Sequence, residues 1–135
     1  MHRERAVKFD VKEPPRRFVA GFVTLSDCAS VRLEPDEQLT FLSEDGAEFD
    51  VARKDWGYYA TPSTNGRLAR FGLRTALVLN SQGSLYVLLV RTGYEDSFQR
   101  YLDTEKLRVL AWLDSEEAVQ KLVRRLQEAD RPCVE

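Results

Sequence analysis

Two apolar segments in the second half of the sequence restrict the fold most. Residues 74–79 (RTALVL) and 85–90 (LYVLLV) are rich in branched and aromatic residues, and the turn-forming residues 80–83 (NSQG) separate them. Branched and aromatic side chains favour strands, and a short polar segment with glycine favours a reversal between them. The segments therefore predict a β-hairpin. Because successive residues are apolar, we expect cover on both faces or a central place in a sheet.

Helix periodicity appears twice after this hairpin. Four residues spaced for one helix face predict a short helix over residues 94–103: Tyr94, Phe98, Tyr101 and Leu102. Residues 107–113 again resemble a strand. Asp114 is expected to be the N-cap of a final helix, with Glu117 completing a capping box. The apolar side of that helix would consist of Ala118, Val119, Leu122, Val123 and Leu126.

The helix over residues 94–103 connects two apolar strands and thus predicts a crossover. Such a connection places strands 85–91 and 107–113 parallel to each other. Earlier in the chain, residues 18–25 predict a buried strand and residues 28–33 a second one. Residues 38–43 and 48–51 flank an Asp45-Gly46 step, which supplies the positive φ of a tight turn and predicts another hairpin.

These elements predict an α+β fold with a mixed, mostly antiparallel sheet. The N-terminal half is rich in strands, and two amphipathic helices complete a C-terminal ββαβα order. A chain of 135 residues and 15.5 kDa fits a single domain, which we place at residues 18–129. Pro14 and Pro15 disfavour helix and central strand, so residues 1–17 are expected to form an extended or flexible arm. Residues 130–135 are expected to be a frayed tail.

Composition excludes several classes of function. A formal net charge of −2 provides no positive field for nucleic acid. No apolar run approaches the roughly 20 residues that cross a membrane, and no signal peptide is evident, so we expect a cytoplasmic protein. His2 is the single histidine, which disfavours a metal site or histidine base, and no cofactor is expected. Cys28 and Cys133 are expected to remain reduced, with Cys28 structural.

The segment from Trp56 to Arg74 contains the highest density of ligand-binding groups. Glycines at 57, 66 and 72 permit close backbone approach, and the aromatic rings could stack on a base or sugar. Guanidinium groups match phosphate or carboxylate oxygens, and spacings of three and four would align them on one helical turn. The predicted ligand-binding residues are Trp56, Tyr58, Tyr59, Ser63, Thr64, Asn65, Arg67, Arg70 and Arg74.

An alternative interpretation gives the same residues a structural role. Tyr58, Tyr59 and Phe71 would then fill the core, while the arginines pair with Asp36, Glu37 or Asp55. Residues 34–37 gather three carboxylates, but their spacing matches no calcium loop and favours a solvated acidic turn. Catalytic residues stay unknown; the available acids or bases are Glu34, Asp36, Asp50 and Asp55, with Tyr58 and Tyr59 as weaker candidates. Trp112 is expected in the core.

Residues 33–41 (LEPDEQLTF), 49–63 (FDVARKDWGYYATPS) and 65–68 (NGRL) carry a resemblance. They resemble a family of small uncharacterised bacterial proteins that accompany genes for cell-surface polysaccharide or sugar modification. The resemblance covers residues from about 20 to 115. It transfers no activity, cofactor or catalytic residue, but it favours a sugar as ligand.

The leading hypothesis is an accessory or binding protein for a phosphorylated or nucleotide-linked sugar in polysaccharide biosynthesis. In this hypothesis the arginines bind the anion, the aromatic rings stack, and Ser63, Thr64 and Asn65 fix the orientation. A sugar-nucleotide isomerase or transferase with a carboxylate or tyrosine base is one alternative. A protein-interaction adaptor without a small ligand is the other, and a partner enzyme or a homo-oligomer would suit it.

Overall fold

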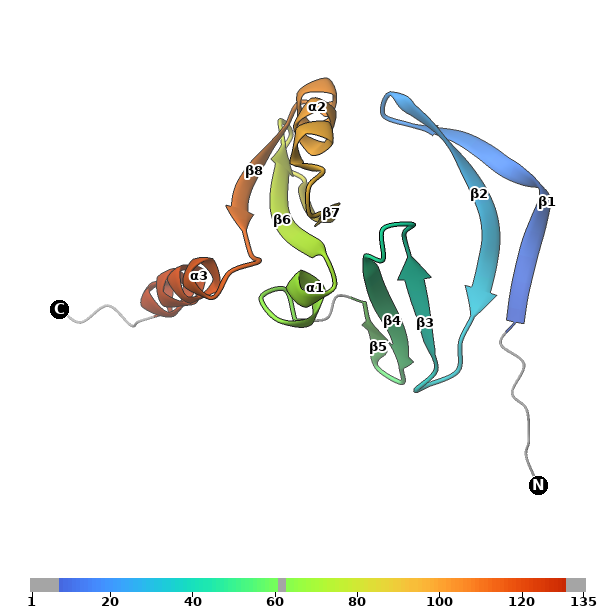
Figure 1. Ribbon diagram of the computed structural model, residues 1–135, viewed down its shortest axis with the longest axis horizontal. Coiled ribbons are helices and arrows are strands. Elements are labelled where there is room, and N and C mark those ends of the chain that lie inside the picture. Colours follow the sequence, from blue (N-terminus) through green and yellow to red (C-terminus); the bar gives the residue numbers. More distant parts are fainter. Residues whose placement is uncertain (1–7, 61–62, 131–135) are drawn as a thin grey trace. The chain divides into compact units, whose positions relative to one another are not determined.

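The computed structural model describes residues 8–60 and 63–130 (Figure 1). Over these residues the fold is α+β, rich in strands, with antiparallel sheets. The strands are β1 (Lys8–Ala20), β2 (Val23–Arg32), β3 (Gln38–Leu42), β4 (Glu48–Lys54), β5 (Gly57–Tyr59), β6 (Leu73–Asn80), β7 (Leu85–Arg91) and β8 (Leu107–Trp112). The helices are α1 (Arg67–Arg70), α2 (Glu95–Glu105) and α3 (Glu116–Ala129). None of these helices is long and apolar enough to cross a membrane.

The chain divides into two compact units. The first unit consists of Met1–Leu39 and Val51–Ala60, and the second of Thr40–Asp50 and Thr61–Glu135. The hairpin β3–β4 therefore contributes its base to the first unit and its tip to the second. The arm over 1–17, the domain over 18–129 and the tail over 130–135 stay predictions, and residues 1–7 and 131–135 lie outside the described part.

In the first unit, β1 and β2 form a two-stranded antiparallel sheet, here called the β1–β2 ribbon. The expected single strand over residues 18–25 is wrong, because the chain reverses at Gly21 and Phe22. Gly21 has a φ of 61°, a conformation that glycine adopts without steric cost. Phe18 and Leu25 therefore lie opposite each other on neighbouring strands, and both are exposed instead of buried.

The hairpin predicted around Asp45-Gly46 is confirmed as β3–β4. Gly46 has a φ of 89°, and the amide of Gly46 donates to the carbonyl of Ser43. The strand β5 then pairs antiparallel with β4, with Ala52 opposite Tyr59. The segment from Trp56 to Arg74, here called the connector, therefore begins with the short strand β5. Its later part contains the helical turn α1.

The second unit contains the three-stranded sheet β7-β6-β8. The hairpin predicted over 74–79 and 85–90 is confirmed as β6–β7, and α2 confirms the helix predicted over 94–103. β7 and β8 both pair antiparallel with β6, so they run parallel to each other as expected. They are not neighbours, however, and the expected mixed sheet is wrong here because β6 lies between them.

The two faces of this sheet are covered differently. On the face that we call the α2 face, Ala76 and Val78 are fully buried against Leu102 of α2. Trp112 belongs to the rim of this cluster, where it is half-buried and edge-on to the ring of Phe98 at 5.7 Å. Alternation along β6 places Leu73, Thr75, Leu77 and Leu79 on the opposite face, which we call the α1 face. There Leu73 packs against Leu68 of α1 and Ala47 of the hairpin tip.

The N-cap of α3 is Ser115, not Asp114 as the sequence suggested. The Ser115 hydroxyl accepts a hydrogen bond from the Ala118 amide at 3.1 Å. Asp114 instead accepts from Arg74 Nε at 2.7 Å, a charge-assisted bond that local sequence rules do not consider. Serine and aspartate cap equally well, so the long-range arginine decides between them.

A buried hydroxyl provides a test of the packing on the α1 face. Thr75 is 0% exposed, and its Oγ1 has no hydrogen-bond partner among the described residues. We expect Thr75→Val to raise the free energy of unfolding by about 1 kcal/mol, because an unsatisfied buried hydroxyl costs about 1–3 kcal/mol. Urea denaturation measures this change. Thr75→Ser, which keeps the hydroxyl and loses a methyl group, should destabilise; destabilisation by valine would show that the hydroxyl has a partner.

Candidate functional site

The nine predicted ligand-binding residues are divided between the two units. Trp56, Tyr58 and Tyr59 belong to the first unit, and the six residues from Ser63 to Arg74 belong to the second. Each group is therefore described by itself. Residues 61 and 62 of the connector lie outside the described part.

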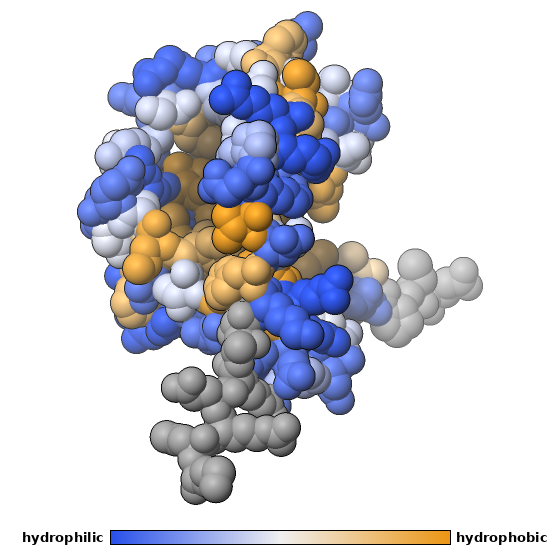
Figure 2. All heavy atoms as spheres, turned by 90° about the vertical axis from the view of Figure 1, so that its right-hand side faces the viewer, coloured by the Kyte–Doolittle hydropathy of each residue, from blue (hydrophilic) through white to orange (hydrophobic). Residues whose placement is uncertain are grey.

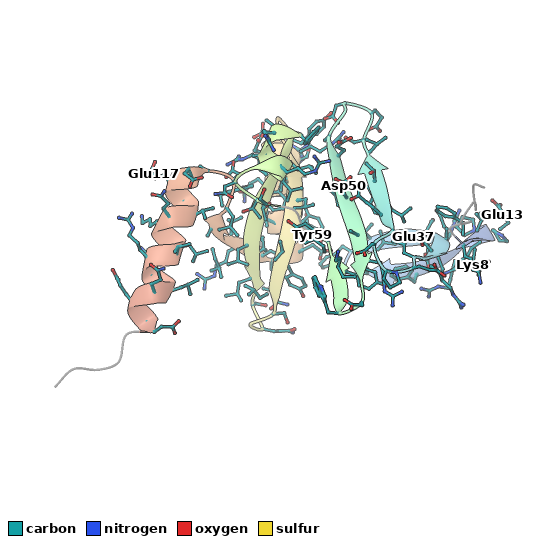
Figure 3. The ribbon with its side chains drawn as sticks, turned by 90° about the horizontal axis from the view of Figure 1, so that it is seen from below. Lys8, Glu13, Glu37, Asp50, Tyr59 and Glu117 are labelled. Atoms are coloured by element: carbon teal, nitrogen blue, oxygen red, sulfur yellow. The ribbon has the colours of Figure 1, made fainter. Side chains whose placement is uncertain are left out.

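The three aromatic residues of the first unit are exposed. Trp56 lies in the turn between β4 and β5 and is 69% exposed, while Tyr58 and Tyr59 on β5 are 59% and 51% exposed. Tyr59 is labelled in Figure 3. The alternative in which Tyr58 and Tyr59 fill the core is therefore wrong. Exposed rings are free to stack on a ligand or on another protein.

The acidic turn of the first unit is organised by its own neighbours. Lys54 Nζ contacts Asp36 Oδ1 at 2.6 Å, and Glu37 accepts from the Glu34 amide at 2.6 Å. Arg53 donates to the carbonyl of Leu33 at 2.7 Å. The hydrogen bond with Asp36 raises the pKa of Lys54. Within the described ranges, no group of three or more histidine, cysteine or acidic residues is placed to hold a metal ion.

Ser63, Asn65 and Gly66 build the start of α1 in the second unit. The Ser63 hydroxyl accepts from the Arg67 amide at 3.0 Å, which satisfies a free donor of the helical turn. A Cβ on Gly66 would lie 2.6 Å from that hydroxyl, so a larger residue here would displace the Ser63 side chain from its bond. Asn65 Nδ2 donates to Glu116 Oε2 of α3 at 3.0 Å, and Thr64 is half-buried. Ser63 and Asn65 therefore have structural bonds in this arrangement.

Arg67 binds a buried carboxylate, although its own side chain is still 42% exposed. Its Nε and Nη2 donate to Asp50 Oδ2 at 3.0 and 2.7 Å, and the Asp50 side chain is only 9% exposed. Thr40 Oγ1 donates to the other oxygen, Oδ1, at 2.8 Å. The hydrogen bond from Thr40, followed by the bond and charge of Arg67, lowers the pKa of Asp50 although burial opposes this shift. The guanidinium also lies 4.6 Å from the ring centre of Phe71.

Arg74 is likewise neutralised by acids of its own unit. It lies on β6, not on the helical turn of Arg67 and Arg70, and binds Asp114 at 2.7 Å and Glu95 at 3.4 Å. Its guanidinium is stacked 4.1 Å from the ring centre of Trp112. The bond with Asp114 raises the pKa of Arg74, and Glu95 adds to this shift while burial opposes it.

Arg70 differs from the other two arginines. It is exposed and makes no ion pair with any residue that the structure describes. It lines an open depression of about 320 Å³ in the second unit, together with Asp45, Gly46, Ala47, Phe71, Gly72 and Thr92. A hydrogen bond from Ser43 lowers the pKa of Asp45, with the Ala47 amide and Arg91 contributing to the same direction. One cation and one carboxylate therefore border this depression.

Sequence reasoning missed the ion-pair partners of the arginines. Asp50 had been a candidate acid or base, and Asp114 a helix cap, whereas the alternative interpretation paired the arginines with Asp36, Glu37 or Asp55. No local spacing signals an ion pair across 17 or 40 residues. The nine-residue ligand site stays a prediction, and in the described structure Arg70 is the member whose charge is most available.

Matched arginine variants test the structural role of Arg67. We expect Arg67→Ala to lower the free energy of unfolding by about 2 kcal/mol, since a hydrogen bond to a charged group contributes roughly 1.5–3 kcal/mol and Asp50 would stay buried without its cation. Arg70→Ala changes an exposed arginine three residues further along the same helical turn and should alter the free energy of unfolding by less than about 0.5 kcal/mol. Urea denaturation at neutral pH measures the free energy of unfolding of both variants. An equal decrease in the two would contradict a stabilising role for the Arg67–Asp50 pair.

No family model, curated protein or solved structure matches this chain. The resemblance drawn from residues 33–41, 49–63 and 65–68 therefore stays a prediction.

Proposed function

We propose that this protein is a protein-interaction module, with one face of the β1–β2 ribbon as its contact surface. The observation that carries the proposal is that this face is apolar and exposed. Pairing across the ribbon brings Phe9, Val11, Phe18 and Ala20 of β1 to the same face as Val31, Ala29, Leu25 and Val23 of β2. The other face carries mainly polar residues, together with the exposed Val19: Lys8, Asp10, Arg17, Thr24, Ser26, Ser30 and Arg32.

The exposure of the apolar face is large. Phe9 and Val11 are 58% and 60% exposed, Phe18 is 37%, and Val23 and Leu25 are 45% and 44%. A two-stranded sheet is marginally stable in water unless its apolar face packs on something. Contiguous exposed apolar side chains rimmed by polar residues are typical of interaction surfaces. Figure 2 shows orange hydrophobic residues among the blue hydrophilic ones at the surface of the protein.

The charges of the ribbon indicate the chemistry of the partner. Five basic residues (Lys8, Lys12, Arg16, Arg17 and Arg32) exceed three acidic ones (Asp10, Glu13 and Asp27), which gives a net charge of +2 in a chain whose formal charge is −2. At the centre of the apolar face, Asp27 is bound by Lys12, and Arg16 lies 3.5 Å away. The bond with Lys12 lowers the pKa of Asp27. A partner protein with an apolar surface bordered by acidic groups would suit this surface.

The ribbon is better suited to contact through its face than through its edge. Pro14 and Pro15 lack the amide hydrogen that strand addition requires, and the register shifts between Val11 and Arg16. Prolines and irregularities of this kind protect exposed strand edges from pairing. The exposed rings of Trp56, Tyr58 and Tyr59 in the same unit offer further contact area of the kind enriched in protein interfaces.

A second candidate function keeps the predicted small anionic ligand. It is favoured by Arg70, which has no ion pair among the described residues and lines a depression of about 320 Å³. One phosphate of a sugar phosphate or nucleotide sugar would face Arg70, with the hydroxyl of Thr92 nearby. Asp45 lines the same depression and limits the site to a single anionic group. The isomerase or transferase alternative gains less support, because Asp50, held by two donors with a lowered pKa, is a weak base.

The ribbon proposal predicts binding loss without unfolding. We expect the double variant Phe18→Ser with Leu25→Ser to lose its protein partner while its melting temperature stays within a few degrees, because both side chains are exposed. Affinity capture of the tagged full chain from the cells that make it, with quantified proteins, compares this variant with the wild type. Calorimetry with the purified partner then measures the affinity.

The matched control for this test is Arg17→Ser with Ser26→Asn, which changes an opposed pair on the polar face. This control should retain the partner. Equal capture by wild type, ribbon variant and control, or a large drop in melting temperature for the ribbon variant, would contradict an open contact face.

The anion proposal predicts a thermal shift that depends on Arg70. Inorganic phosphate and a uridine-diphosphate sugar, each at millimolar concentration, are expected to raise the melting temperature of the wild type but not of Arg70→Ala, since the guanidinium supplies the phosphate contact. Arg124→Ala on the exposed side of α3 removes an equal charge elsewhere and should keep the shift. No shift in the wild type, or a shift that survives in Arg70→Ala, would exclude this site.

A further inference from the structure

The helix α3 presents a broad apolar stripe that its own chain covers only in part. Six residues form the stripe: Ala118, Val119, Leu122, Val123, Leu126 and Ala129. At 100° per residue they span roughly 140° of the helix circumference, wider than the narrow seam of a two-helix coiled coil. None of the residues of α3 is buried, and Val123 and Leu126 are exposed.

No described strand or helix lies along α3. Extensive contacts within the second unit join α2, α1 and the three strands of the sheet, but not α3. In Figures 1 and 3 the helix extends away from the sheet β7-β6-β8, with Glu117 labelled near its start. A helix of 14 residues is close to the minimum length of about 12–15 residues that is stable alone in water. Its stripe therefore requires cover.

The direction of α3 is fixed at its first turn. The Leu113 amide donates to the carbonyl of Thr75 at 2.8 Å, and Asp114 is bound by Arg74. Glu116 then accepts from Asn65 Nδ2 at 3.0 Å. Since three positions around the start of the helix are bound, α3 continues from them outward and does not cover the α1 face of its own sheet.

The sheet has an open apolar area on its α1 face. Leu73 and Leu89, near one end, are packed against Leu68, Ala47 and Phe49. Farther along the same face, β6 contributes Leu77 and Leu79 and β7 contributes Leu85 and Val87. Leu85 and Val87 are 57% and 54% exposed, although strand alternation directs them to the same side as the buried Leu73. We call these four residues the open half-sheet.

We propose that α3 of one copy covers the open half-sheet of a second copy, and that the exchange is reciprocal. A helix stripe of this width is suited to a sheet face, and layers of helix on sheet are a common way to complete a core. The basic residues Lys121, Arg124 and Arg125 lie outside the stripe and stay in water. In such a dimer, a two-fold axis pairs α3 of each copy with the open half-sheet of the other copy. Both surfaces are then covered, so no further copy can be added.

This dimer does not depend on the β1–β2 ribbon, because both of its surfaces belong to the second unit. The interaction module proposed above would then act as a two-fold unit that presents two ribbons. Loss of the ribbon partner and loss of the dimer are separate measurements, so either proposal can fail without the other.

Disulfide trapping in the full chain tests the exchange. In a background with Cys28→Ser and Cys133→Ser, we combine Val87→Cys with either Leu122→Cys or Leu126→Cys. Mild oxidation is expected to give, for at least one pair, a covalent dimer of twice 15.5 kDa that reductant reverses. The control Val87→Cys with Arg124→Cys, on the polar side of α3, should form no covalent dimer.

The other outcomes overturn the proposal. A disulfide within one chain would mean that α3 covers its own sheet, and a covalent dimer from Leu122→Cys without Val87→Cys would mean that two α3 helices pair. No cross-link in either pair would mean that the surfaces do not meet.

Light scattering provides a second readout without cysteines. The wild type is expected at twice 15.5 kDa, and both Leu122→Glu and Val87→Glu at 15.5 kDa, with circular dichroism unchanged. Arg124→Glu should remain a dimer. A monomeric wild type at micromolar concentration, or dimers that survive both glutamate variants, would overturn the proposal.

Discussion

The arrangement of the second unit depends on the ion pair between Arg67 and the buried Asp50. The pair fixes the single turn of α1 against β4, and this position lets Leu68, which is 1% exposed, close over Leu73 and Ala47. A helical turn of four residues has no stability of its own, so it depends on such contacts. Arg74 has the same role at the start of β6, where Asp114 and Glu95 join the ends of β8 and α2.

In the described structure, several apolar surfaces remain exposed to solvent. Among the described residues, the buried ones are confined to the sheet β7-β6-β8, α1, α2 and the tip of the β3–β4 hairpin, together with Leu33. The β1–β2 ribbon and α3 are amphipathic elements of regular geometry, yet their apolar faces remain exposed. Because such faces are unfavourable in water, both point to contacts with other protein surfaces. The proposed interaction with other proteins rests on this common property.

The sequence predicted the local elements with most success where a strong turn signal separated apolar segments. The Asp45-Gly46 and NSQG segments marked hairpins that the structure contains, and the apolar period over 94–103 marked α2. Prediction failed at Gly21, where one glycine without other turn residues divides what resembled a continuous strand. It failed again at Asp114, where the competition between two capping residues is decided by an arginine 40 residues away.

The sequence by itself determined the hairpins β3–β4 and β6–β7 and the helix α2, because alternation, helix periodicity and turn residues act over a few neighbouring positions. It also marked Arg67, Arg70 and Arg74 as the cations of the connector. Only the tertiary structure decided that Arg67 and Arg74 face Asp50 and Asp114 while Arg70 faces solvent, since electrostatic partners are set by distance in space. It likewise decided which apolar faces stay exposed, because burial depends on what each face meets and not on its own pattern.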